Sequence, residues 1–265
     1  MYTIILLLFV SHISCLPWSK PEYEFKFETI WLTMTDGIRL SCTLGIPTPT
    51  NNKKNETFPI LLEYLPYRKD DSFYYTNYQD YWYFSRRGYI VAKVDIRGTG
   101  ASDGIRVPKE YSTIELDDCE SVIEQLSQLS ISNGNVAMMG FSWSAFNSLM
   151  MAILRHPPAL KAIYAAHGSE DLYFNDIHYM DGILHEDEYI LSVDHENALP
   201  RTPDYVIDDD FIQQRFNSNS TYPWTDLYLQ HQIDSQFWSQ HSIMYYYKNL
   251  TIPVYLLAGY YDSYN

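Results

Sequence analysis

The stretch Val136-Ala137-Met138-Met139-Gly140-Phe141-Ser142-Trp143-Ser144-Ala145 joins a short apolar run to the start of a helical pattern through a serine. The run Val136–Met139 is typical of a buried strand, and Ala145 to Arg155 predicts a helix that ends before Pro157. A serine between such a strand and such a helix resembles a nucleophile elbow, Gly-x-Ser-x-Gly. This turn is strained and its backbones pass closely, so the residues two before and two after the serine must be small. Gly140 and Ser144 meet that condition.

Outward from this turn, apolar strands alternate with helical patterns. The turn Asp36-Gly37 predicts a hairpin between the first two strands. Ser112 and Glu115 form a capping box that predicts the start of a helix reaching Leu126. The strands are expected at 23–28, 39–46, 58–64, 89–94, 136–139, 160–166 and 254–258. Two antiparallel strands followed by a β-α alternation predict an α/β fold with a mostly parallel sheet.

The alternation stops between residues 168 and 248, where the sequence is acidic, aromatic and polar. We interpret 169–248 as an inserted, mainly helical cap. Residues 22–168 then form the first part of the core, and 249–265 return to it as one strand and a loop.

The first residues have the pattern of a targeting signal. The apolar run Ile4–Val10 precedes a short polar stretch, which predicts a signal peptide over 1–15. The alternative is a buried N-terminal strand. Sequons at Asn55, Asn219 and Asn249 favour the secretory pathway, and we therefore expect a secreted protein. If Cys15 leaves with the leader, Cys42 and Cys119 remain, either paired or as free thiols.

Composition excludes several classes of function. Lys and Arg total 18 and Asp and Glu total 33, which gives 18 − 33 = −15. Such a charge repels phosphate backbones, so we expect no nucleic-acid partner. No apolar run after residue 20 is long enough to span a membrane. No cofactor motif is visible, and the oligomeric state is not predicted.

Further blocks flank the elbow in a fixed order. They are Tyr64-Leu65-Pro66-Tyr67-Arg68-Lys69, Val94-Asp95-Ile96-Arg97-Gly98-Thr99-Gly100-Ala101-Ser102-Asp103-Gly104, Ser132-Asn133-Gly134-Asn135 before the elbow strand, and Ala258-Gly259-Tyr260-Tyr261-Asp262. Together they resemble the Xaa-Pro dipeptidyl-peptidase / cocaine-esterase-like family of α/β-hydrolases, from about residue 27 to the last residue. Ala145 and Ile131 stand where this family often has Gly and Trp.

The resemblance implies an α/β-hydrolase fold and a role for four residues. Ser142 would be the nucleophile, and Asp262 the acid that orients a histidine. The hydroxyl of Tyr67 and the backbone N–H of Trp143 would form the oxyanion hole. From the residues alone, Asp95 and Arg97 are expected to pair with each other or to bind loop backbone beside the site.

The triad histidine is missing. In α/β-hydrolases it follows the acid, yet no histidine follows Asp262. We therefore expect a C-terminally truncated core and a nearly inactive 265-residue chain. Among the earlier histidines, His167 is the most plausible substitute, because it follows a strand near the carboxyl edge of the sheet.

Two classes of function stay open. The first is a secreted serine hydrolase that acts on small esters or on Xaa-Pro peptide bonds. A peptidase needs carboxylates to hold a free α-amine, and the candidates are Glu170, Asp171, Glu186 and Glu188. The second is a secreted, non-catalytic binding protein, which the missing histidine favours and the presence of Ser142, Tyr67 and Asp262 opposes.

Overall fold

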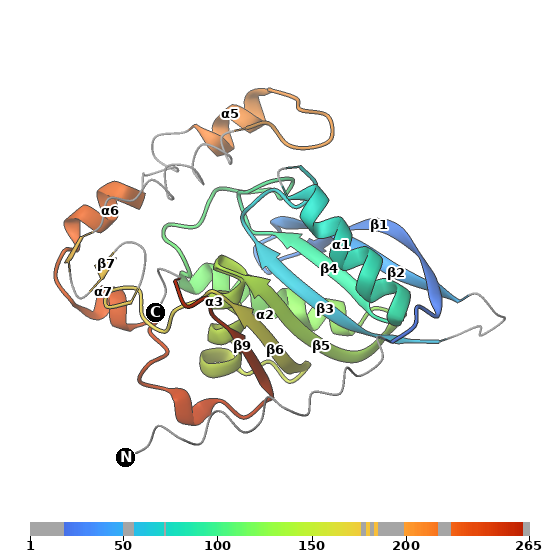
Figure 1. Ribbon diagram of the computed structural model, residues 1–265. Coiled ribbons are helices and arrows are strands. Elements are labelled where there is room, and N and C mark those ends of the chain that lie inside the picture. Colours follow the sequence, from blue (N-terminus) through green and yellow to red (C-terminus); the bar gives the residue numbers. More distant parts are fainter. Residues whose placement is uncertain are drawn as a thin grey trace, which may run out of the picture.

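A mixed β-sheet forms the centre of the molecule (Figure 1). A computed structural model describes residues 19–49, 56–71, 73–175, 179–180, 183–184, 199–216 and 224–261. Within these residues, seven strands form one sheet in the order β1-β2-β4-β3-β5-β6-β9. They are β1 (Tyr23–Thr33), β2 (Arg39–Pro49), β3 (Phe58–Leu65), β4 (Ile90–Asp95), β5 (Ser132–Phe141), β6 (Leu160–Ala166) and β9 (Val254–Leu257). The pairs β1–β2 and β2–β4 are antiparallel and the others are parallel, which confirms the predicted α/β fold.

The hairpin between β1 and β2 closes where the sequence predicts it. Gly37 has φ +87°, the left-handed conformation that glycine adopts without strain. The N–H of Met34 donates to the carbonyl of Ile38, and the side chain of Asp36 accepts from the Ile38 N–H. β1 lies at the edge of the sheet and stays half exposed, so it needs alternating rather than continuous apolar residues.

Three helices connect the parallel strands. They are α1 (Tyr74–Phe84), α2 (Thr113–Ser127) and α3 (Trp143–Met150), which continues as a π-helical turn at Met151–Arg155. Right-handed crossovers place α1 on one face of the sheet and α2 with α3 on the other (Figure 1). A short 3-10 turn at Ser85–Arg87 leads from α1 into β4.

The described part of the cap contains short elements. These are α5 (Asp209–Arg215), α6 (Trp224–Gln230), α7 (Gln236–Ser239), a 3-10 turn at Tyr247–Asn249, and the paired strands β7 (Tyr179–Met180) and β8 (Ile183–Leu184). Figure 1 shows the three helices beyond the carboxyl ends of the parallel strands. The boundaries 169–248 stay a prediction.

The two cysteines of the core are free. Cys42 lies on β2 and Cys119 on α2, and both are fully buried. Burial raises the pKa of the Cys42 thiol to about 12, so it acts as a small apolar side chain. The alternative of a Cys42–Cys119 disulfide is therefore wrong in this structure.

The signals for secretion fall mostly outside the described residues. The predicted leader, Asn55 and Asn219 all lie there. Asn249 is described and half-buried, and its amide nitrogen donates to the carbonyl of Ile153 at 3.5 Å. Because a glycan is attached at that nitrogen, this contact opposes glycosylation of Asn249. None of the helices in the described ranges is long and apolar enough to cross a bilayer.

Candidate active site

Ser142 sits on the tight turn between β5 and α3. Its φ and ψ are 55° and −118°, a strained conformation for a residue with a side chain. Three backbone hydrogen bonds hold it: its N–H donates to the carbonyl of Ala166 at 3.0 Å, and its carbonyl accepts from the N–H groups of Ala145 at 2.8 Å and Phe146 at 3.1 Å. The predicted elbow is therefore confirmed, at the carboxyl edge of the sheet.

Small neighbours allow this turn. A Cβ placed on Gly140 would lie 2.0 Å from the Cβ of Ser144, so no larger residue fits. Ser144 is fully buried and donates its hydroxyl to the carbonyl of Tyr64 at 3.1 Å. Ser144 thus replaces the usual glycine and also ties the elbow to β3.

Tyr67 lies against the serine. It follows β3, and its hydroxyl donates to Oγ of Ser142 at 3.4 Å. Its ring stacks on Phe73 with the centroids 5.1 Å apart and meets the Trp143 indole edge to face at 6.4 Å. Trp143 is the first residue of α3, so its backbone N–H has no acceptor within the helix. The structure therefore brings Ser142, Tyr67 and Trp143 together.

The loop that carries Tyr67 is fixed by Asp95. Its buried carboxylate accepts the N–H of Lys69 and the N–H of Ala101, both at 2.9 Å. Gly100 approaches so closely that a Cβ there would lie 2.3 Å from Oδ2 of Asp95. Burial raises the pKa of this carboxyl, against the effect of the Lys69 cation. Of the two expectations for Asp95, binding to loop backbone is correct.

Arg97 does not pair with Asp95. Its guanidinium donates to both oxygens of Asp118 on α2, at 2.7 and 2.8 Å, and also to Asp36 in the hairpin turn. These carboxylates raise the pKa of Arg97 further. Arg97 thus links the hairpin, the loop after β4 and α2.

Two buried charged residues beside the site were not predicted. Arg68 follows Tyr67 directly, has φ 57°, and donates to Asp71 and to the carbonyls of Leu199 and Pro200. It therefore joins the Tyr67 loop to the middle of the predicted cap. The sequence offers no signal for the contacts with Leu199 and Pro200, because these partners are backbone atoms 131 and 132 residues away.

Glu115 is the second of these residues, and the capping box is wrong. Ser112 occupies the N-cap of α2 but makes no capping hydrogen bond with its side chain. Glu115 points inward, where it accepts from the N–H of Tyr111 and from the side chains of Trp143 and Asn147. The helix does begin after Ser112, as predicted, but Glu115 binds Tyr111, Trp143 and Asn147 instead of the N-cap residue.

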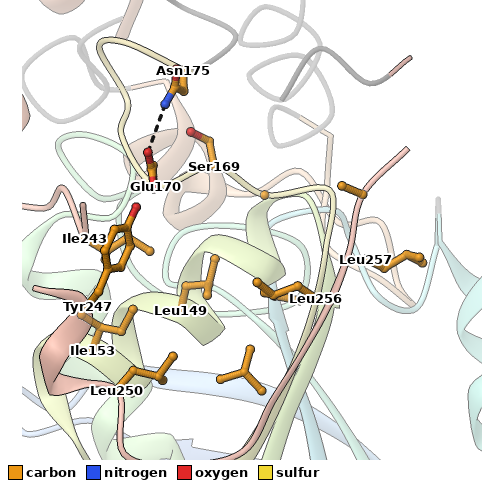
Figure 2. A pocket seen from close by; sticks show the side chains of 14 residues that line it. Leu149, Ile153, Ser169, Glu170, Asn175, Ile243, Tyr247, Leu250, Leu256 and Leu257 are labelled. Carbon is orange, nitrogen blue, oxygen red and sulfur yellow. Dashed lines mark hydrogen bonds between the residues drawn. The ribbon is translucent and has the colours of Figure 1, made fainter. Parts of the chain in front are cut away.

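An apolar pocket of about 400 Å³ runs beside α3 (Figure 2). Leu149 and Ile153 line it on one side and Leu256 on the other, with Ser169 and Glu170 near its polar end. Gly168 also lines it and touches the first turn of α3, since a Cβ there would lie 3.1 Å from the Cβ of Ala145. The wall of the pocket therefore contacts the first turn of α3, although Ser142 and Tyr67 do not line it.

Asp262 lies outside the described residues, as do His178, His185 and His195. His167 follows β6, and its ring packs on Phe141 with the centroids 4.9 Å apart. His241 is buried in the cap, where burial and the Lys109 cation lower its pKa to about 4. The hydrogen bond that the structure gives to Oγ of Ser142 comes from Tyr67. No base for Ser142 is thus identified among the described histidines.

One of the amine-binding candidates is already engaged. Oδ1 of Asp171 accepts the backbone N–H groups of Tyr173 and Phe174, both at 2.8 Å. Glu170 accepts from the amide of Asn175 at 3.4 Å at the end of the apolar pocket (Figure 2). Glu186 and Glu188 lie outside the described residues.

The elbow, the tyrosine beside it and the parallel sheet agree with a family model. Residues 36–265 match the model of X-Pro dipeptidyl-peptidase (S15 family). The chain belongs to this family. The resemblance inferred from the sequence blocks is thereby confirmed.

Sequence relatives of this chain include esterases, and solved structures with the same fold include an aminopeptidase. Cocaine esterase of Rhodococcus sp. is 32% identical over 148 residues, which cover 55% of this chain and 24% of that protein. A CocE/NonD family hydrolase from Staphylococcus aureus has a TM-score of 0.62 at 20% identity, over 87% of this chain and 40% of that one. An aminopeptidase from a Thaumarchaeota archaeon of marine sediment has a TM-score of 0.65 at 20% identity, over 91% and 44%. These structures establish the α/β-hydrolase fold, and the chain spans about a quarter of the length of the cocaine esterase it matches.

Proposed function

We propose that the complete protein is a serine hydrolase that forms an acyl-enzyme on Ser142. The observation that carries the proposal is the strained elbow, which holds Oγ of Ser142 at 3.4 Å from the hydroxyl of Tyr67. A protein gains nothing for its stability from a serine at φ 55° beside a buried phenol. Membership of a hydrolase family supports the same conclusion.

The geometry suits acyl transfer. Oγ of Ser142 would attack the carbonyl carbon of the substrate and lose its proton to a histidine. That histidine is not identified among the described residues. The negative charge would develop on the carbonyl oxygen. The Trp143 N–H at the start of α3 and the Tyr67 hydroxyl would both donate to that oxygen. Asp262 would orient the histidine, as the family resemblance implies.

The test compares variants of the complete protein on a p-nitrophenyl ester. Ser142→Ala is expected to lower kcat by about 10⁴ to 10⁶. Tyr67→Phe removes one oxyanion donor, and we expect a loss of up to about 10² to 10³ in kcat with little change in KM. A Ser142→Ala protein as active as the wild type would refute the proposal. Absence of any turnover by the complete wild-type protein would favour a binding role instead.

The 265-residue chain by itself is a separate test. The structure identifies no base for Ser142 among the described histidines, and we therefore expect this chain to hydrolyse the same ester at least about 10⁴-fold more slowly than the complete protein. Turnover at the rate of the complete protein would show that a histidine of this chain, with His167 as the first candidate, serves Ser142.

The substrate class can be decided at Glu170. Its carboxylate lies at the end of the apolar pocket, where it could hold the α-ammonium group of a dipeptide whose first side chain fills the pocket. If so, Glu170→Gln raises KM for an Xaa-Pro-anilide and leaves hydrolysis of a p-nitrophenyl ester unchanged. Equal effects on both substrates would show that Glu170 does not bind the α-ammonium group of the substrate.

Secretion is part of the proposal. The apolar N-terminus and the sequons at Asn55 and Asn219 support it, whereas the contact of Asn249 with Ile153 opposes glycosylation there. Expression in a eukaryotic secretory host, followed by N-terminal sequencing of protein from the medium, tests it. Retention of Met1 on an intracellular product would contradict it.

A further inference from the structure

Glu115 is a carboxylate placed inside the core. It is the third residue of α2 and is fully buried. A carboxylate without partners in that environment would cost several kcal/mol, so its contacts must be exact in number and direction. Three N–H donors reach it: the backbone of Tyr111 at 2.8 Å, the Trp143 indole at 2.7 Å and the Asn147 amide at 2.9 Å.

The two oxygens divide these donors. Oε1 receives both donors from α3, and Oε2 receives the N–H of Tyr111 before α2. Trp143 and Asn147 are four residues apart, so they lie on the same side of α3 one turn from each other. One carboxylate thus fastens the first turn of α3 to the start of α2.

Two ring contacts also pack against the Trp143 indole. Tyr111 packs against it with the centroids 5.1 Å apart, and Trp224 of α6 at 5.5 Å. Ring contacts alone permit an indole to slide or tilt, because they have little directionality. The hydrogen bond to Glu115 supplies the direction.

We propose that Glu115 is the positioning residue of the oxyanion site: by holding the Trp143 indole and the Asn147 amide, it sets the place of the Trp143 backbone N–H beside Ser142. The role of that N–H in catalysis rests on the function proposed above. The claim that Glu115 sets the position of the N–H does not depend on that function, and it is tested separately.

Protonation of Glu115 offers a way to observe this link. Burial raises the pKa of its carboxyl to about 7, and the nearby Glu110 adds to the effect. The ionised carboxylate accepts all three donors, whereas a protonated one turns one oxygen into a donor and loses a partner. The position of the Trp143 indole and of its backbone N–H should therefore change as the pH passes through neutrality.

The other titratable groups around Glu115 must be considered. Tyr64 of β3 and Cys119 of α2 face it, and burial raises both pKa values well above neutrality. Asp118 is paired with Arg97, and Glu110 accepts the hydroxyl of Tyr228 from the cap. Lys109, with its pKa lowered to about 8 by burial, is the group that could be mistaken for Glu115. A Glu115 variant separates the two.

The experiment labels the tryptophans of the complete protein with ¹⁵N, so that Trp143 gives one backbone and one indole cross-peak. Trp143→Phe assigns both by their loss. Between pH 5.5 and 8.5 we expect the two peaks to shift together with one midpoint near 7. Glu115→Gln keeps Oε1 for the two α3 donors, is uncharged like the protonated carboxyl and cannot titrate, so both peaks should stay near their low-pH positions. Glu120→Gln on the exposed side of α2 is the matched control and should titrate as the wild type does.

Three results would overturn the proposal. The indole peak could shift while the backbone peak stays fixed, which would leave Glu115 a local partner with no influence on the N–H. Both peaks could be flat in the wild type. Both could titrate unchanged in Glu115→Gln, which would assign the transition to another group.

A kinetic test on the complete protein adds the catalytic part. Glu115→Ala is expected to lower kcat for a p-nitrophenyl ester by about 10- to 100-fold with KM nearly unchanged, since only the charge of the transition state uses the N–H. Glu115→Gln, which keeps an acceptor for both α3 donors, should recover most of that loss. An unchanged kcat in a folded Glu115→Ala protein contradicts the proposal. If the wild type has no turnover, the proposed function fails, and the labelled tryptophans alone decide the link.

Discussion

At Gly140 the elbow leaves no space for even one methyl group. A Cβ there would meet the Ser144 Cβ at 2.0 Å and the Ser144 backbone at 2.8 Å. The neighbour is main chain at the start of α3, which cannot move without displacing Ser142. We expect Gly140→Ala to lower the free energy of unfolding by about 3 kcal/mol, at the upper end of overpacking costs. Urea denaturation followed by far-UV circular dichroism measures it.

Gly134 provides the control for this substitution. It lies in the same strand and has φ +85°, with open space where a Cβ would be placed. Gly134→Ala therefore meets backbone strain without a clash, and the expected loss is about 1 kcal/mol. Equal losses in the two variants would show that the elbow relaxes around an added methyl group.

At the scale of the element, α2 carries a pH dependence of stability. The pKa of Glu115 rises from 4.5 to about 7 on folding, because burial disfavours the charge more than its three hydrogen bonds favour it. The folded state thus binds this proton more tightly than the unfolded state. The contribution of Glu115 is greatest below pH 4.5 and is lost as the pH rises to about 7, by about 3 kcal/mol.

The measurement is the difference between wild type and Glu115→Gln in urea denaturation at several pH values. The wild type should lose stability relative to the variant as the pH rises from about 4.5 to 7. Parallel curves would show that Glu115 has an ordinary pKa. A carboxylate that costs stability at neutral pH and yet is buried beside the elbow is what a positioning role requires.

The elements differ in how far the sequence predicts them. β4 is apolar or shielded at every position, and its continuous run identified it. α1 was not placed, because its aromatic residues occupy all sides of the helix: Tyr81 is buried while Tyr75 and Trp82 are exposed. No 3.6-residue period emerges from such a pattern.

The site divides in the same way. Ser142 and Gly140 belong to one local turn, so their spacing in the sequence sufficed. Tyr67 could be assigned only through the family blocks, because its contact with Ser142 joins residues 75 apart. Glu115 was assigned to a cap because the alternative partners lie on α3, 28 and 32 residues away. Contacts of this separation depend on the packing of helices and leave no periodic signal.

At the scale of the whole molecule, β9 presents an apolar edge of the sheet. Within the described residues it pairs with β6 alone, and Tyr255, Leu256 and Leu257 are 64, 66 and 45% exposed. An unpaired apolar edge is a template for another strand. The charge of −15 opposes association between copies, but salt screens this repulsion within about 8 Å at physiological strength.

We therefore expect the 265-residue chain to self-associate at tens of micromolar, and to do so more strongly in 0.5 M than in 0.05 M NaCl. Leu256→Lys places a charge on the edge and should return the protein to monomers in both salts. Tyr245→Lys adds the same charge to an aromatic residue away from the sheet that is 55% exposed, and it should associate as the wild type does. Sedimentation velocity distinguishes these cases. If both lysine variants dissolve the oligomer equally, net charge rather than the β9 edge controls association, because the two proteins share the same total charge and differ only in where it lies.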